Sequence, residues 1–524
     1  MLSSCGLASN SPRLFRTTLG AFSLIFLAAV LSASAVAFFY PLEIETREST
    51  VWLHVLALRQ GINLYDHTQV AFINTNHGPF DPIFKLAVVS LFPFLEAWQV
   101  TRFSVFILPY VFLFVAWKIL KTQLRRPFCE VAFLGSVGYL FLIVSAKEFI
   151  FVGRSDATAA ILLLVLIYLS ISKVPARSWS RLLRGFTCGS VGILLILTNW
   201  RVLPAVFVLF IFSLWMMTNK HHAGRDLVLY SASYLGASAA IFGLLLYQSF
   251  GFDLSLYSSH FFGVYSKASG HGHRTYGHAP AIWFLGSLLK PTSRPDSLKG
   301  GPVLLALVVY LLVPNKASVQ NRAWFVLGAF VFAACTVAYY LNYYGGGSWY
   351  YIPFLIVLWF FLCTNYQAMS SSRLAAVGAA LVVLVCINIE TVVKPTVWRI
   401  ATLSPAYEFM SRLRSLERTN TVLSEDTFFF RTAYQSELID MGDMVSRVRM
   451  RGYFGGDFNR TVDNHFERIR KQPPDYIVTG FTESSELRSV IDLSYALVAE
   501  GPGNLTANGG QASRLFKRMD TDVP

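Results

Sequence analysis

Charge is scarce in this chain of 524 residues, since only 14% of its residues are charged while 54% are hydrophobic. A water-soluble fold of this length exposes far more polar surface, and a mean hydropathy of +0.49 therefore excludes a soluble globular protein. Cysteine is also scarce, with six residues in all and none between residues 393 and 524. No Cys-x-x-Cys pair occurs, so the sequence predicts neither a disulfide framework nor a cysteine metal site.

Acidic residues are too few to balance the basic ones, and the formal net charge is +14. The excess of Lys and Arg lies within residues 1–392, because residues 393–524 hold equal numbers of acidic and basic side chains. Basic residues spread between apolar runs indicate orientation signals and contacts with lipid headgroups, not a nucleic-acid partner. Internal repeats are absent as well, which disfavours a transporter built from repeated halves.

Long apolar runs dominate residues 19–392, and a run of ~20 apolar residues is long enough to cross a membrane as a helix. The first run could also be a cleaved signal peptide, but we favour a retained span because the run continues to Tyr40. We expect an α-helical polytopic membrane protein with about eleven transmembrane helices. The expected spans are 19–40, 103–121, 128–147, 157–173, 185–200, 202–218, 227–248, 302–314, 323–343, 350–365 and 374–392.

Every second connection between these spans is short and basic, which places these connections and residues 1–18 in the cytoplasm. The longer loops, 41–102 and 249–301, then lie on the outer side together with residues 393–524. Within the first of them, the stretch 82–93 is apolar but short and contains Lys85, which predicts a helix lying at the membrane interface.

Residues 393–524 show the alternation of a small α/β domain, which we expect to be extracytoplasmic. Runs rich in β-branched and aromatic residues predict strands at 421–424, 475–479 and 495–498. Helical periodicity predicts amphipathic helices between them, at 441–450 and 462–471.

Three carboxylates, Glu43, Glu45 and Glu48, follow the first span within eight residues. A carboxylate at membrane level can act as a general base or hold a metal ion. A solvated, charged interface is the alternative explanation for each of them taken singly.

Charged residues also occupy very short outer connections between spans. Arg154 and Asp156 lie close to hydrocarbon, where charges are costly unless they are paired or face a polar cavity. Asp156 could equally cap the next helix. Arg201 lies between two barely separated spans, where it could reach outward to water or clamp a phosphate with its guanidinium fork.

The second outer loop contains Arg274 among three histidines and several glycines. The histidine spacing suits no single helix face, so a loop that orders over substrate is a better interpretation than a zinc site. The glycine run 345–347 lacks the lysine and hydroxyl residue of a phosphate-binding loop, and nucleotide binding is not predicted there.

Several short motifs, each weak alone, occur in an order that resembles the GT-C superfamily of integral membrane glycosyltransferases. This group includes protein O-mannosyltransferases and the aminoarabinose transferases of lipid A. The motifs are Arg47-Glu48, Gly61-Ile-Asn-Leu-Tyr65, Asn76-His77-Gly78-Pro79-Phe80, Gly153-Arg154-Ser155-Asp156, Asn199-Trp200-Arg201 and Gly347-Ser348-Trp349-Tyr350-Tyr351-Ile352-Pro353. The chain departs from the family at Arg47, where the acidic pair usually begins with Asp.

The resemblance implies an enzyme that moves a sugar from a polyprenyl-phosphate donor to a lipid, glycan or protein acceptor at the outer face, with inversion. Glu48 stands where the family has a carboxylate, with Glu45 as a substitute base, and Glu43 and Glu45 could hold a divalent metal if one is used. The residues expected to bind donor phosphate or substrate are Arg201, Arg154, Asp156, Arg274, His77, Tyr350 and Tyr351.

The expected location is the bacterial inner membrane, with the C-terminal domain in the periplasm. Two other functions remain open from the sequence. One is a transporter or flippase of lipid-linked sugars, and the other is a non-catalytic protein of envelope polysaccharide assembly.

Overall fold

The computed structural model describes the following residues of the chain, together with a few single positions between 460 and 470: 11–41, 44, 47–65, 78–121, 128–145, 152–172, 178–218, 224–254, 319–342, 351–366, 371–388, 404–416, 421–424, 471–479, 485–501 and 514–519.

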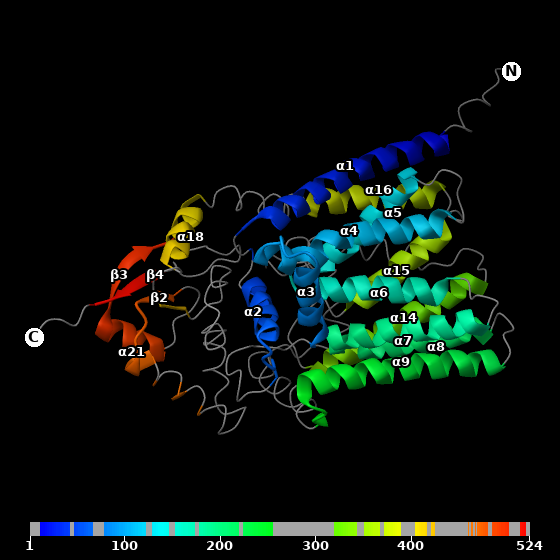
Figure 1. Ribbon diagram of the computed structural model, residues 1–524. Helices are drawn as coiled ribbons and strands as arrows, with labels where there is room; N and C mark the ends of the chain where they lie inside the picture. Colours follow the sequence, from blue (N-terminus) through cyan, green and yellow to red (C-terminus); the bar gives the residue numbers. More distant parts are fainter. Residues whose placement is uncertain are drawn as a thin grey trace, which may run out of the picture.

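Long apolar helices form a bundle in which the helix axes run roughly side by side (Figure 1). Four stretches of the described chain are long and apolar enough to cross a membrane, and shorter apolar helices pack beside them. The four are Ala97–Lys121, Trp179–Thr198, Trp200–Thr218 and Gly224–Phe250. The span predicted at 302–314 lies outside the described residues.

The bundle helices follow the apolar runs closely, although several begin earlier in the chain than predicted. They are α1 (Ser11–Phe39), α4 (Ala97–Lys121), α5 (Phe128–Ser145), α6 (Ser155–Ile171), α7 (Ser178–Thr198), α8 (Leu203–Thr218), α9 (Gly224–Phe250), α14 (Val319–Asn342), α15 (Ile352–Asn365) and α16 (Ser371–Asn388).

Small residues let α7 and α9 pack closely. A Cβ on Gly189 would lie 2.2 Å from the carbonyl oxygen of Tyr234, and one on Gly185 would lie 2.6 Å from that of Tyr230. Arg181 and Asp226 form an ion pair near the starts of the two helices. This packing fixes the C-terminal end of α7, from which the next functional segment begins.

Two short helices, α2 (Arg47–Arg59) and α3 (Phe80–Leu91), lie at one end of the bundle (Figure 1). The helix predicted at 82–93 therefore forms, as α3, and its place at the membrane interface stays a prediction. Lys85 is fully buried within the protein, and its ammonium pairs with the buried Asp81 at 2.8 Å.

A four-stranded sheet lies at the same end of the molecule, beyond α2 and α3 (Figure 1). Its order is β1 (Val422–Ser424), β2 (Tyr476–Thr479), β4 (Arg514–Arg518) and β3 (Tyr495–Glu500), with β1 parallel to β2 and the other pairs antiparallel. The three strands predicted from the sequence form, whereas β4 and the helices α18 (Ser404–Leu416) and α21 (Ser485–Ser494) were not predicted. The helix predicted at 441–450 lies outside the described residues.

Candidate active site

Glu48, in the first turn of α2, is fully buried and binds Arg102 of α4 in a bidentate ion pair. Arg102 Nε donates to Oε1 at 2.7 Å and one terminal nitrogen donates to Oε2 at 2.6 Å. The backbone N–H groups of Ile44 and Gly153 donate to the two oxygens at 2.8 and 2.9 Å. Four donors thus occupy the lone pairs of this carboxylate.

The other side of Arg102 is equally well bound. Its second terminal nitrogen donates to the carbonyl oxygens of Ala37 and Tyr40, at the C-terminal end of α1. The pair Glu48–Arg102 therefore joins α1, α2 and α4 at the bundle end. Four hydrogen bonds occupy the lone pairs that a base would use to accept a substrate proton, so the contacts of Glu48 in this structure are those of an anchor, and its role as the base stays a prediction.

Gly153 joins this ion pair to a second one. Its N–H donates to Glu48, while its carbonyl oxygen lies 3.5 Å from Nζ of Lys85. Asp81 binds Lys85 with one oxygen and accepts the Thr158 hydroxyl with the other, at 2.6 Å. The two helices of the first outer loop, α2 and α3, are therefore both anchored to one residue, Gly153, which precedes the motif Arg154-Ser155-Asp156.

Glycine at position 153 is required by the packing. A Cβ there would lie 2.4 Å from the carbonyl oxygen of Thr101 and 2.6 Å from its carbonyl carbon. These are backbone atoms of α4, so they cannot move aside as a flexible side chain could.

Arg154 and Asp156 pair with each other, and Asn199 links Asp156 to the backbone of Arg201. Arg154 Nε lies 3.3 Å from a carboxylate oxygen of Asp156, in the first turn of α6. The other oxygen lies 3.5 Å from the side-chain nitrogen of Asn199. Asn199 also accepts the backbone N–H of Arg201, capping the 3₁₀ turn η2 (Trp200–Val202) that precedes α8.

The segment before α3 packs onto this cluster. The N–H of Gly78 donates to the carbonyl oxygen of Thr198, the residue before Asn199. A Cβ on Gly78 would lie 1.9 Å from the carbonyl oxygen of Leu197, so only glycine permits the approach. The predicted residue His77 is adjacent in sequence but lies outside the described residues.

The remaining predicted residues separate into two groups. Tyr351 is fully buried, with its hydroxyl 3.3 Å from that of Thr336 and its ring packed on Phe332 of α14. The side chain therefore packs in the interior between α14 and α15, and its predicted place in a sugar site stays a prediction. Outside the described residues lie Glu43, Glu45, Arg274 and Tyr350.

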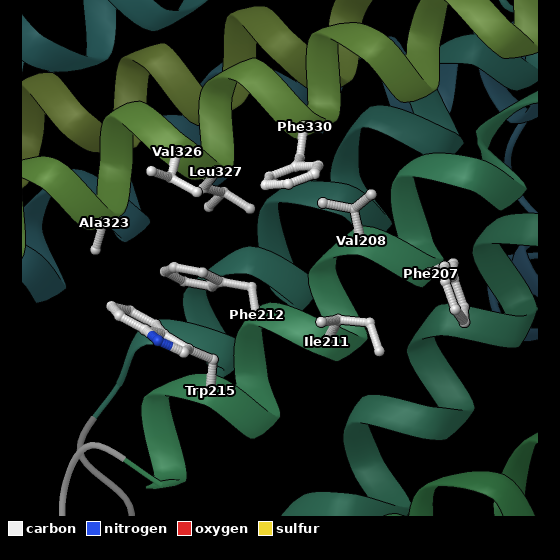
Figure 2. A pocket seen from close by; sticks show the side chains of 9 residues that line it. All are labelled: Phe207, Val208, Ile211, Phe212, Trp215, Ala323, Val326, Leu327 and Phe330. Carbon is white, nitrogen blue, oxygen red and sulfur yellow. The ribbon is translucent and has the colours of Figure 1, made fainter.

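A large apolar cavity of about 540 Å³ opens between α8 and α14. Figure 2 shows Phe212 and Trp215 of α8 across from Val326 and Leu327 of α14. Several lining side chains are half exposed or more, such as Phe330 at 61%. Phe207, the first lining residue of α8, follows Arg201 by six positions, which is about 9 Å along the helix axis at 1.5 Å per residue.

Arg102 and Asp81 belong to the candidate site but were not predicted from the sequence, and Lys85 was noted only as a charge in the predicted interfacial helix. Each is a charge inside or beside an apolar stretch, which is the signal that could have found them, because such charges need a partner. Among the residues that the structure describes, no group of three or more His, Cys, Asp and Glu side chains could hold a metal ion.

The overall fold is similar to that of a solved membrane protein, ArnT from Cupriavidus metallidurans. Its apo structure is 12% identical with a TM-score of 0.57, over 95% of this chain and 97% of that one. The structure bound to undecaprenyl phosphate gives 12% identity and a TM-score of 0.59, over 96% and 98%. At this identity the likeness shows that the two chains share a fold, which is the kind of fold that the order of motifs predicted.

A weaker similarity is to the archaeal oligosaccharyltransferase AglB from Archaeoglobus fulgidus, solved with an inhibitory peptide and a dolichol-phosphate. It has a TM-score of 0.41 and 11% identity over 95% of this chain and 75% of that one, which is too little to argue from. No protein-family model matches the chain, and no curated protein sequence is similar to it.

Proposed function

We propose that this protein is a glycosyltransferase that moves a sugar from a polyprenyl-phosphate-linked donor to an acceptor hydroxyl at the outer face of the membrane, with inversion. One observation carries the proposal. In an ArnT-like fold, a cluster of basic and amide groups precedes α8, and α8 lines an apolar cavity that it shares with α14.

The head and the tail of such a donor need opposite surroundings. A phosphate binds best to guanidinium groups, and Arg154 and Arg201 supply them at one end of α6 and α8. A polyprenyl chain needs a long apolar surface, which the cavity lined by Phe207 and Phe330 offers beside α8. Because η2 continues directly into α8, a phosphate on Arg201 places the tail along the cavity.

The reaction needs a base for the acceptor hydroxyl and stabilisation of the leaving phosphate. The acceptor oxygen attacks the anomeric carbon, the bond from that carbon to the phosphate oxygen breaks, and the hydroxyl proton passes to a carboxylate. Arg154, Arg201 or Arg274 stabilises the negative charge of the departing polyprenyl phosphate. Asp156 and His77 complete the substrate site.

The geometry of Glu48 favours Glu45 as the base. Glu48 is saturated by Arg102 and two backbone donors, and it serves to hold the first outer loop in place. Glu45 lies three residues before Glu48 in the sequence, and Glu43 lies two residues before Glu45. These two carboxylates would also be the ligands of a divalent ion if the reaction uses one.

The proposed topology follows from the basic loops. About eleven spans place residues 1–18 in the cytoplasm of a bacterium and residues 393–524 in the periplasm as a separate α/β domain. The outer loops 41–102 and 249–301 then face the same compartment as that domain. The position of α2, α3 and the sheet at one end of the bundle supports this arrangement (Figure 1).

The direct test is release of polyprenyl phosphate from a labelled polyprenyl-phosphate sugar by the purified full-length protein when an acceptor extract is added. Acceptor-dependent release supports the proposal, and an intact donor under all conditions refutes it. A flippase or an assembly protein would leave the sugar–phosphate bond unbroken.

The Arg201→Ala variant should lose about 100-fold or more in the rate of polyprenyl phosphate release, because it removes a hydrogen-bond donor to the charge that develops on the leaving phosphate. Arg59→Ala, an exposed arginine at the end of α2, is the matched control and should retain full rate.

The role of the loop-one carboxylates has its own test. Glu45→Gln should lose about 100-fold or more in turnover while the melting temperature stays at the wild-type value, since the change removes a base and keeps the size and shape of the side chain. Glu48→Gln should instead lower the melting temperature, because Arg102 then faces a neutral amide in a buried site. A Glu48→Gln protein with wild-type stability and no turnover would indicate that Glu48, and not Glu45, is the base.

A further inference from the structure

A second cavity, of about 200 Å³, lies at the same end of the bundle, between the ends of α2 and α9 and the start of α3. Helices α2 and α9 each end in a turn with left-handed backbone conformation. Gly61 has a φ of 75°, with the N–H of Ile62 bonded to the carbonyl oxygen of Ala57. Gly251 has a φ of 58° and Phe252 one of 65°, and these turns direct the following chain away from each helix axis.

The walls of this cavity are fixed by packing. The ring of Tyr65, which follows the α2 turn, lies 4.4 Å from the ring of Phe250 at the end of α9. The side chain of Asn63 accepts the N–H of Tyr65 at 3.0 Å, which holds the segment 61–65 in one conformation. The cavity is therefore a formed feature of the loop-one helices and α9.

The chemistry of the lining suits a neutral, hydroxyl-bearing ring. Asn63 and Gln248 supply amides, Ser249 supplies a hydroxyl, and Tyr65 and Pro79 supply apolar faces. Among the described residues that line the cavity none is charged, and the polar groups that they supply are neutral amides and a hydroxyl. Its polar groups also distinguish it from the apolar cavity between α8 and α14.

The size and position of the cavity limit what it can hold. Pockets for larger ligands have volumes of ~300 Å³ or more, so this one accommodates a single sugar ring. Pro79 lines the cavity, and the N–H of the preceding residue, Gly78, donates to the carbonyl oxygen of Thr198. The next residue, Asn199, contacts Asp156 through its side chain. The cavity lies at the end of α2 opposite to Glu48, about 20 Å away for a helix of this length. A ring bound there would lie next to the segment that contacts Asn199 and Asp156, and would leave the space beside Arg154 and Arg201 free for the donor.

We propose that this cavity binds a neutral pyranose unit of a glycan acceptor, at a position removed from the hydroxyl that receives the transferred sugar. The assignment to the acceptor rests on the proposed function. It selects a glycan from the acceptor classes that the fold alone leaves open.

The test uses methyl α-mannopyranoside, methyl β-glucopyranoside and methyl β-galactopyranoside as probes, with saturation-transfer difference NMR on the full-length protein in nanodiscs. At least one probe should receive saturation from the wild-type protein. The signal should fall at least threefold in Asn63→Ala and in Gln248→Ala, whose side chain is exposed and not needed for folding. Gln60→Ala is the matched control, since this exposed amide lies one residue outside the cavity lining and its removal should leave the signal unchanged.

Absence of saturation for all three pyranosides would overturn the proposal, as would an equal signal in wild type and in both cavity variants. The release assay separates this failure from failure of the proposed function. Donor cleavage without pyranoside binding would refute only the cavity. Pyranoside binding without any donor cleavage would refute the glycosyltransferase, and with it the acceptor assignment, while the sugar site would stand.

Discussion

At the scale of single residues, Gly153 is the position where the two buried ion pairs meet. Its N–H donates to Glu48 and its carbonyl oxygen accepts from Lys85, while a Cβ at this position would collide with the backbone of Thr101. The packing requires glycine here because it has no side chain, and not because of a left-handed backbone, since the φ of Gly153 is not positive. The arrangement makes position 153 the most sensitive residue of the site to a small change.

Gly153→Ala should lower the melting temperature markedly and reduce turnover. The new methyl group forces α4 and the 152–154 segment apart, at a cost of about 1–3 kcal/mol or more for overpacking, and both ion pairs lose a partner. Gly236→Ala in α9 is the matched control, because a Cβ there meets nothing within 4 Å. It should be neutral or stabilising by up to ~1 kcal/mol through helix propensity. Equal melting temperatures for the two variants, measured by thermal unfolding in detergent, would contradict this account.

At the scale of elements, α3 is held in the bundle by polar contacts. Asp81 and Lys85 are one helical turn apart on α3, and both are buried against Thr158 of α6, whose hydroxyl meets that of Ser104 at 2.7 Å. Breaking a buried ion pair from one side costs more than removing both partners, because the remaining charge has no counterpart. The attachment of α3 therefore depends on the pair as a unit.

Lys85→Met should detach α3 from the bundle, with a loss of about 3–5 kcal/mol. Hydrogen-exchange mass spectrometry should show faster exchange in peptides covering Phe80–Leu91. The double variant Asp81→Asn/Lys85→Met should recover part of the protection, since no unpaired charge is left. Slower exchange in the single variant than in the double one would show that the pair is not what holds α3.

The sheet has a pH-dependent contact of its own. Asp475 precedes β2 and accepts the backbone N–H and hydroxyl of Thr421, which precedes β1, at 2.9 and 2.8 Å. These hydrogen bonds hold the pKa of Asp475 below its ordinary value of 3.8. The carboxylate therefore stabilises the β1–β2 pair at neutral pH, and this contribution is lost as the pH falls below 3.8 through the folded-state value.

Asp475→Asn should weaken the sheet at pH 7 by ~0.5 kcal/mol, a small value because the side chain is partly exposed and screened by solvent. The difference from wild type should shrink as the pH falls below 3.8. Urea unfolding of the full chain, followed by hydrogen exchange in peptides of β2, measures this at pH 7 and in acid. Asp492→Asn on α21 is the control, since that carboxylate contacts Arg488 on its own helix and no strand. A difference that persists unchanged in acid would exclude the capping role.

At the scale of the whole molecule, the polar chemistry is gathered at one end. The loop-one helices, the start of α6, the 3₁₀ turn and the four-stranded sheet lie at the same end of the bundle, while α9 begins at the other (Figure 1). A lipid-linked donor is confined to the membrane with its phosphate at the surface, so a site at one end is what its geometry requires.

Cysteine accessibility checks this arrangement in cells. In a background without native cysteines, Arg59→Cys on α2 and Arg488→Cys on α21 should react with a membrane-impermeant maleimide from outside. Arg225→Cys at the start of α9 should react only after permeabilisation. Labelling of positions 59 and 488 from different sides would refute the proposed topology.

The apolar runs alone were enough to predict the helices of the bundle, because hydropathy over ~20 residues is a local property that no partner has to supply. The clustering of Arg154, Asp156 and Arg201 could be anticipated from charges at the ends of adjacent runs. The role of Glu48 could not be predicted, because its partner Arg102 is 54 residues away and only packing brings the two together. The burial of Lys85 and Tyr351 likewise depends on neighbours from other helices, which no local pattern specifies.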